Sequence, residues 1–125
     1  MLLHLTDIST EPLHEQITRQ IRVKILTGEL KEGDVLPSIR AMARENRVSV
    51  ITVQRAYDEL INEGLVYAKQ GKGNFVNPLT DEMKLKIAEN RLSDSLLPII
   101  RDAVAMKLTS DQILKIVRKL IGREG

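Results

Sequence analysis

The stretch from Ser49 to Gly64 constrains the fold of this chain more than any other. Ser49 is a favourable N-cap, because its hydroxyl can accept a free backbone N–H of the first helical turn. Gly64 is the kind of residue that follows a helix C-terminus. Apolar residues recur between them at i, i+3, i+4, i+7 and i+8, which places them on one helix face. These residues are Val53, Ala56, Tyr57, Leu60 and Ile61.

The opposite face of this predicted helix begins with side chains that can contact something outside the domain. These side chains are Val50, Ile51, Thr52, Gln54 and Arg55. A shorter helix, capped by Ser38 and covering roughly 39–45, precedes it after a tight turn. A short helix, a turn and a longer second helix have the spacing of a helix-turn-helix.

A β-hairpin is predicted directly after the long helix. Its strands are expected at 65–69 and 74–76, around the sequence Gln70-Gly71-Lys72-Gly73. The two glycines allow positive φ in a tight turn and a close approach of the backbone to another surface. The sequence therefore predicts a mainly α fold with a small β-hairpin, a winged helix-turn-helix. Residues 38–63 form the helix-turn-helix and about 65–77 form the wing.

Residues 9–78 are expected to form one domain, because an amphipathic helix with Leu13, Ile17, Ile21 and Ile25 on one face precedes the helix-turn-helix. Residues 79–125 have a separate helical pattern, and Pro98 predicts a kink near 95–97 or a division into two helices. Two amphipathic helices of this size would leave apolar surface exposed, so we expect an α-helical dimerisation tail. The residues expected at its interface are Leu92, Leu96, Ile99, Ile100, Ala103, Ile113, Ile116, Val117 and Leu120.

The basic residues matter through their position rather than their number, because the net charge is only +2. Residues 38–56 contain four arginines and a single acid, and Lys69 and Lys72 lie at the hairpin. The arginines are Arg40, Arg44, Arg47 and Arg55. This distribution predicts a local basic surface of the kind that binds nucleic acid.

Other kinds of chemistry are poorly supported by the composition. There is no cysteine, the two histidines lack a metal-ligand spacing, and the three aromatic residues are too few for stacking single-stranded bases. The N-terminus lacks the pattern of a secretory signal, and no run is apolar for long enough to cross a membrane. We therefore expect a cytoplasmic, nucleoid-associated protein without cofactor, metal site or enzymatic activity.

The chain resembles the DNA-binding domain of the GntR family of bacterial transcription factors from about Pro12 to Val76. The resemblance is carried by Leu36-Pro37-Ser38-Ile39-Arg40, Val48-Ser49, Thr52-Val53, Glu63-Gly64-Leu65 and Gly71-Lys72-Gly73 in this order. The segment from Ala56 to Leu60 and the very short tail are similar to the YtrA subfamily. The resemblance implies a homodimer on a palindromic operator, with the second helix of the helix-turn-helix in the major groove and the wing near the minor groove.

The resemblance also implies roles for single residues. Arg40 corresponds to a family residue that contacts a base or a phosphate, and Thr52 to a threonine that contacts the DNA backbone. Gly71 corresponds to the glycine at the wing tip. Where the family often has Arg-Thr after the capping serine, this chain has Val50-Ile51, which removes a guanine contact and favours an A·T-rich half-site. The expected DNA contacts are Arg40, Ser49, Val50, Ile51, Thr52, Gln54, Arg55, Gln70, Gly71 and Lys72.

Several alternatives remain open at this point. Val50 and Ile51 could be core residues over the turn, and Arg40 could pair with Glu45 or Asp34. The leading hypothesis is a dimeric repressor. The sequence leaves open whether a small-molecule effector binds the tail. The alternative function is a winged-helix module that binds a protein partner without sequence-specific DNA binding.

Overall fold

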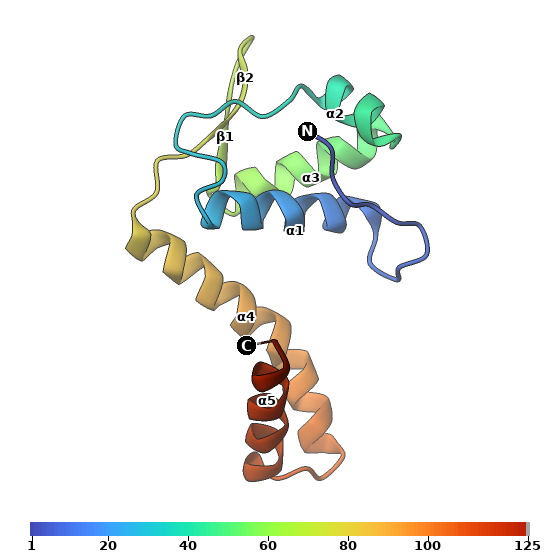
Figure 1. Cartoon of the computed structure of the whole chain (residues 1–125), viewed down its shortest axis with the longest axis vertical. Coiled ribbons are helices and arrows are strands. Elements are labelled where there is room, and N and C mark those ends of the chain that lie inside the picture. The colour runs from blue at the N-terminus through green and yellow to red at the C-terminus, as the bar shows by residue number, and fades with distance from the viewer. Residues whose placement is uncertain (125) are drawn as a thin grey trace. The chain divides into compact units, whose positions relative to one another are not determined.

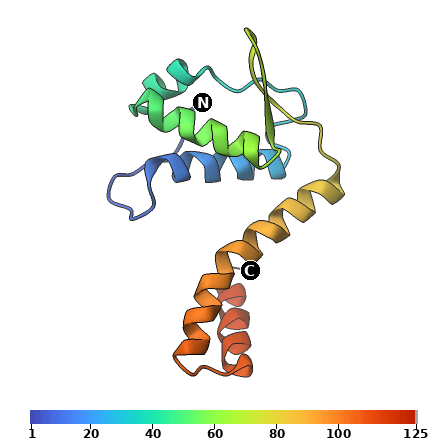
Figure 2. The ribbon, with the colours of Figure 1, turned by 180° about the vertical axis from the view of Figure 1, so that it is seen from behind.

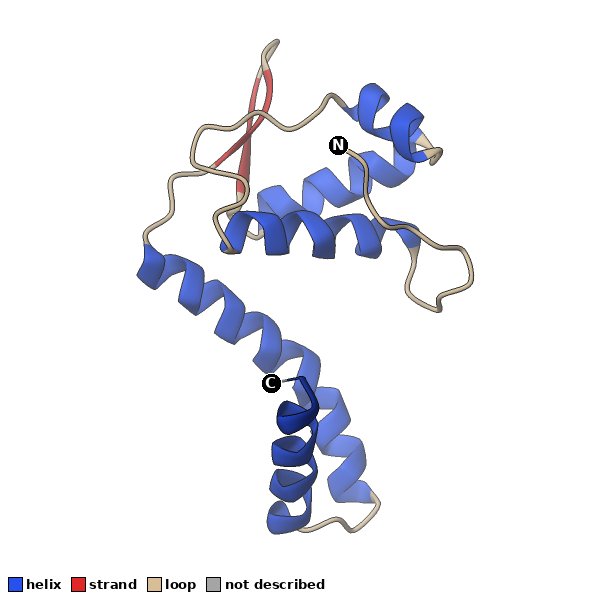
Figure 3. Cartoon of the chain, in the orientation of Figure 1, coloured by secondary structure: helices blue, strands red, loops and turns tan. Residues whose placement is uncertain are grey.

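The computed structural model describes residues 1–124, which divide into two compact units, Met1–Leu85 and the residues from Lys86 onward. The first unit contains three helices and a hairpin, and most of the second is helical (Figure 1). The elements, in chain order, are α1 Leu13–Leu26, α2 Ile39–Asn46, α3 Val50–Asn62, β1 Val66–Lys69, β2 Gly73–Val76, α4 Asp81–Ala105 and α5 Ser110–Glu124. The expectation of a mainly helical fold with one small hairpin is confirmed (Figure 3).

The two serines predicted to start the helices of the helix-turn-helix both act as caps. Ser38 Oγ accepts the Ala41 N–H at 3.1 Å, and Ser49 Oγ accepts the Thr52 N–H at 3.0 Å. Between the helices, Arg47 has a left-handed backbone with φ of 55°. This conformation ends α2 and turns the chain into α3 within three residues.

The core of the first unit lies where α1, α3, α2 and the base of the hairpin meet. Its largest fully buried side chains include Ile17, Ile21 and Ile25 from α1 and Tyr57 and Leu60 from α3. The buried Tyr57 hydroxyl donates a 2.7 Å hydrogen bond to the Pro37 carbonyl. Burial raises the pKa of the Tyr57 hydroxyl, so it stays a neutral donor. This bond fixes the start of α2 against α3.

A buried ion pair joins α1 to the end of α3. Arg22 Nε and Nη2 donate to the two carboxylate oxygens of Glu63 at 2.7 and 2.9 Å. The two side chains are only 10% and 12% exposed. A bidentate contact of this kind fixes both distance and orientation, because the guanidinium and carboxylate planes match.

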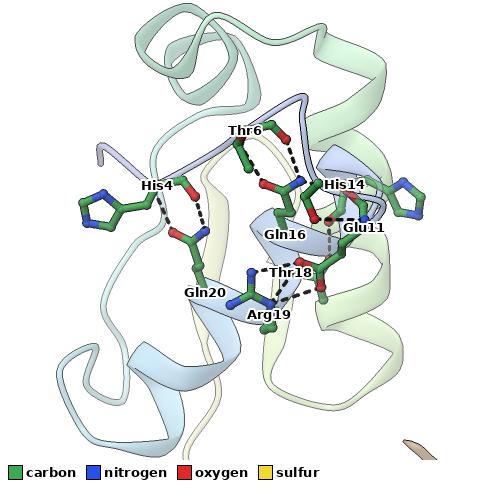
Figure 4. Close-up of polar contacts among 9 residues, drawn as sticks. His4, Thr6, Glu11, His14, Gln16, Thr18, Arg19 and Gln20 are labelled. Atoms are coloured by element: carbon green, nitrogen blue, oxygen red, sulfur yellow. Dashed lines mark hydrogen bonds and ion pairs between the residues drawn. The ribbon is translucent and has the colours of Figure 1, made fainter.

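The N-terminal segment is attached to α1 by side-chain amides (Figure 4). Gln20 accepts the His4 N–H at 2.9 Å and donates to the His4 carbonyl at 2.8 Å. Gln16 pairs with both backbone groups of Thr6 in the same way, at 3.0 and 2.9 Å. Each amide therefore pairs with both the backbone N–H and the carbonyl of one residue of the segment, as a neighbouring β-strand would.

Arg19, also on α1, donates a hydrogen bond to the carboxylate of Glu11, just before the helix. This hydrogen bond lowers the pKa of the Glu11 carboxyl.

The hairpin is held at its base by the loop that precedes α2. β1 and β2 pair antiparallel with Tyr67 opposite Phe75, and these two rings stack with centroids 5.6 Å apart. The loop adds further backbone bonds to β2, from Leu36 N–H to the Asn74 carbonyl and from Val76 N–H to the Asp34 carbonyl, both 2.8 Å. The wing is therefore fixed at its base, while its tip at 70–72 is exposed.

In the second unit, α4 continues through Pro98 as one helix, so the alternative of two separate helices is wrong. Lys107, with φ of 72°, lies in the turn to α5. Thr109 and Gln112 form the predicted capping box. The Gln112 N–H donates to Thr109 Oγ1, and the Thr109 N–H donates to Gln112 Oε1. Neither α4 nor α5 has a buried residue among those described.

Candidate nucleic-acid interface

The outward side of α3 is exposed as predicted. Val50 is 48% and Ile51 73% exposed, so the alternative that they are core residues is wrong. Gln54 and Arg55 are also exposed, and Thr52 is half-buried. Val50 and Ile51 are large apolar side chains in contact with water. An apolar contact with thymine methyl groups would cover them.

The capping hydrogen bonds position Thr52. Its hydroxyl lies 2.7 Å from Ser49 Oγ, which also accepts the Thr52 backbone N–H. These contacts hold both hydroxyls at the N-terminus of α3. This end of the helix favours an anion, because its unpaired N–H groups and dipole are positive.

Gln54 has an intramolecular partner that the sequence pattern did not predict. Its Nε2 donates to Asp58 Oδ1, one helical turn later, at 2.9 Å. The bond uses one donor of the amide and leaves its carbonyl oxygen and second N–H free of partners within residues 1–124. Spacing of i, i+4 between an amide and a carboxylate is the signal that could have indicated it.

Arg40 is exposed on α2, and the alternative ion pairs with Glu45 and Asp34 do not form. Glu45 pairs with the Met1 amino group, and the Asp34 carboxylate accepts the Lys31 N–H at 2.7 Å. Within residues 1–124, none of the four helix-turn-helix arginines takes part in an ion pair. The basic surface is therefore available for an anionic partner.

The wing tip presents Gln70, Gly71 and Lys72, all exposed. Gly71 has φ of 73° and Gly73 has φ of 114°, conformations that favour glycine over other residues. The tip and α2 lie on the same side of the first unit, and α1 lies on the opposite side (Figures 1 and 2). The elements that carry Arg40 and the predicted wing contacts therefore lie on one side of this unit (Figures 1 and 2).

The predicted tail residues fall into two groups. Leu96, Ile100, Ala103, Ile113 and Val117 are half-buried, whereas the other four are exposed. These exposed residues are Leu92 and Ile99 at 62%, and Ile116 and Leu120 at 49%.

Two other kinds of site find no support in the described part of the chain. Residues 1–124 contain no group of three or more histidine, aspartate or glutamate side chains arranged to hold a metal ion. None of the helices in that range is both long enough and apolar enough to span a membrane.

Comparison with known proteins places this arrangement in a family. The model of "Bacterial regulatory proteins, gntR family" matches residues 13–76. The chain therefore belongs to the GntR family, and its homologues and its fold are those of transcriptional regulators rather than enzymes.

Relatives and solved structures agree with this assignment. The chain is 33% identical to the HTH-type transcriptional repressor YtrA of Bacillus subtilis, over 76% of this chain and 73% of that protein, which supports the YtrA subfamily. A GntR family regulator from Listeria monocytogenes superimposes with a TM-score of 0.71 at 25% identity, covering 92% and 98% of the two chains. The AraR DNA-binding domain in complex with operator ORX1 has a TM-score of 0.54 at 27% identity, covering 61% and 94%.

Proposed function

We propose that this GntR-family regulator is a repressor that binds a palindromic operator as a homodimer. In this proposal α3 lies in the major groove and the wing lies near the minor groove, on the nucleoid in the cytoplasm. The observation that supports it most directly is the exposed outward side of α3, together with helix-turn-helix arginines that form no ion pair within residues 1–124. The similarity to a protein described as a repressor and to a domain solved with operator DNA supports the same function.

The homodimer is supported by the tail. A helical hairpin without a buried residue does not form a stable core alone, because its exposed apolar side chains gain nothing from folding. Pairing with a second tail would bury these side chains. In a two-fold dimer the two copies of α3 can contact two half-sites about one turn of DNA apart, as a palindromic operator provides.

Selection of binding sites from random duplexes tests what α3 recognises. We expect A·T-rich half-sites, because Val50 and Ile51 offer apolar contacts to thymine methyls and Gln54 can pair with adenine. A wrong base pair at such a position should cost about 1–3 kcal/mol. Enrichment of G-rich half-sites opposite α3 would contradict this assignment of bases. Recovery of no preferred sequence would favour the alternative, a module that binds a protein.

Substitution of Arg40 by alanine tests the basic surface. On the selected operator we expect affinity to fall about fivefold to 150-fold, the effect of about 1–3 kcal/mol for an arginine contact to DNA. The melting temperature should not change, because Arg40 makes no ion pair within residues 1–124. Lys115→Ala is the control, an exposed cation on α5. Unchanged operator affinity of Arg40→Ala would remove Arg40 from the interface.

A further inference from the structure

The tail hairpin has one half-buried row of side chains between its two helices. α5 runs back beside the second half of α4, in the opposite direction (Figures 1 and 2). This half-buried row is formed by Leu96, Ile100 and Ala103 on α4 and Ile113 and Val117 on α5. Large exposed apolar residues remain on both sides of this row.

Helix geometry divides these exposed residues into two opposite faces. A helix turns about 100° per residue, so Ile99 and Leu97 lie on opposite sides of the half-buried row on α4. On α5, Leu120 and Leu114 lie on opposite sides in the same way. Because the helices are right-handed and antiparallel, the residues on one side of the row form a single surface on both helices, which we call face A. It consists of Leu92, Ile99, Met106, Ile116 and Leu120. Face B combines Leu97, Val104, Leu114 and Ile121, which are 48%, 57%, 49% and 65% exposed.

One two-fold contact between tails covers only one of these faces. Face A has the larger number of apolar residues and extends along the seven-residue repeat of α4, so we assign it to the dimer proposed above. Face B then stays uncovered in that dimer, with four large apolar side chains in contact with water. A contiguous exposed patch of this kind marks an interaction surface.

The charges that border face B indicate what binds it. Asp94 and Arg101 lie seven residues apart along the α4 edge, and Asp111 and Arg118 lie seven apart along the α5 edge. All four are exposed, and none is in an ion pair within residues 1–124. Charges of both signs in equal number do not suit an anionic membrane or an all-basic partner.

A second copy of face B fits this border. If the two-fold axis runs parallel to the helices, α4 lies antiparallel to α5 of the other copy. Asp94 then meets Arg118 of that copy within about one helical turn, and Arg101 meets Asp111 likewise. Oppositely charged residues at these positions determine register and partner.

We propose that face B is a second self-association interface, which joins dimers into tetramers and, at higher concentration, into longer linear assemblies. This inference depends on the dimer of the proposed function. The resulting tetramer has two pairs of recognition helices, so it can bind two operators at once. Because faces A and B lie on opposite sides of the hairpin, contacts through both do not close on themselves, and each of the two dimers in a tetramer keeps one face B free for a further dimer.

Light scattering and sedimentation velocity on the full chain test the proposal. As the concentration rises through tens of micromolar, we expect the mean mass to rise from about twice to about four times the 14.1 kDa chain mass and above. Val104→Asp combined with Leu114→Asp should reduce it to that of a dimer that binds a single operator within twofold of the unmodified protein. Arg101→Asp alone should also give the dimer, because it places like charges opposite each other, and adding Asp111→Arg should restore the tetramer.

The outcomes separate this inference from the proposed function. Unmodified protein that is dimeric at all concentrations, with intact operator binding, overturns the tetramer and leaves the proposed function in place. A tetramer that persists in the Val104→Asp, Leu114→Asp variant places the second interface elsewhere and overturns the role of face B. Failure of Asp111→Arg to rescue Arg101→Asp overturns the α4-to-α5 register. A monomer overturns both proposals.

Discussion

Aspartate at both Ile99 and Ile116 is expected to abolish the dimer formed through face A and to weaken operator binding at least about a hundredfold. Both side chains are exposed on face A, at 62% and 49%. Charges there would have to be buried without partners in the proposed dimer, which costs far more than the contact gains. Affinity falls because a monomer binds each half-site separately and loses the gain from linking two recognition helices.

The measurement combines sedimentation velocity with a fluorescence titration on the selected operator. Lys115→Asp is a matched control, because position 115 lies on α5 away from the half-buried row and outside both faces. It should remain associated and bind as the unmodified protein does. A double aspartate variant that stays dimeric with full affinity would show that face A is not the dimer interface.

Glu63→Gln is expected to reduce the free energy of unfolding by about 3–5 kcal/mol, the usual cost of breaking a buried ion pair. The carboxylate of Glu63 is the bidentate partner of Arg22, and both side chains are nearly buried. A neutral amide leaves the guanidinium charge without its counter-ion. This is a large fraction of the stability of a domain of this size.

Urea denaturation followed by circular dichroism, at one fixed protein concentration, measures this effect. Glu59→Gln is the control, since Glu59 is exposed on the same helix and forms no ion pair within residues 1–124. It should change stability by less than about 0.5 kcal/mol. Replacing the pair by apolar residues, as Arg22→Met with Glu63→Leu, should recover most of the loss. A loss below about 1 kcal/mol for Glu63→Gln would show that the pair is solvated in solution.

The helix-turn-helix and wing could be predicted from sequence because local chemistry specifies them. Ser38 and Ser49 each have a hydroxyl three residues before the N–H they accept, and Gly71 lies where φ is positive. Ile51 is exposed because it lies on the helix face opposite Val53 and Tyr57. Val50 lies seven residues before Tyr57, on the same side of α3, and its exposure at the first position of the helix did not follow from the spacing.

The contacts between distant segments could not be predicted in this way. Arg22 and Glu63 are 41 residues apart, and each resembles an ordinary solvated charge in the sequence. Gln16 and Gln20 gave no sign that their amides pair with the backbone of Thr6 and His4, because such pairing depends on where the segment lies. In the tail, the apolar pattern indicated an interface, but the antiparallel hairpin is what divides its residues into one inner row and two outer faces.

The central claim is that the outward side of α3 and the wing bind a specific duplex. Fluorescence titration with DNA from upstream of the protein's own gene, against a scrambled duplex of equal length, tests it at two salt concentrations. We predict much tighter binding to the upstream DNA than to the scrambled duplex at both salt concentrations. Binding to each duplex should weaken as the salt concentration rises, because phosphate contacts release counter-ions. Equal affinity for the two duplexes at both salt concentrations would contradict the account.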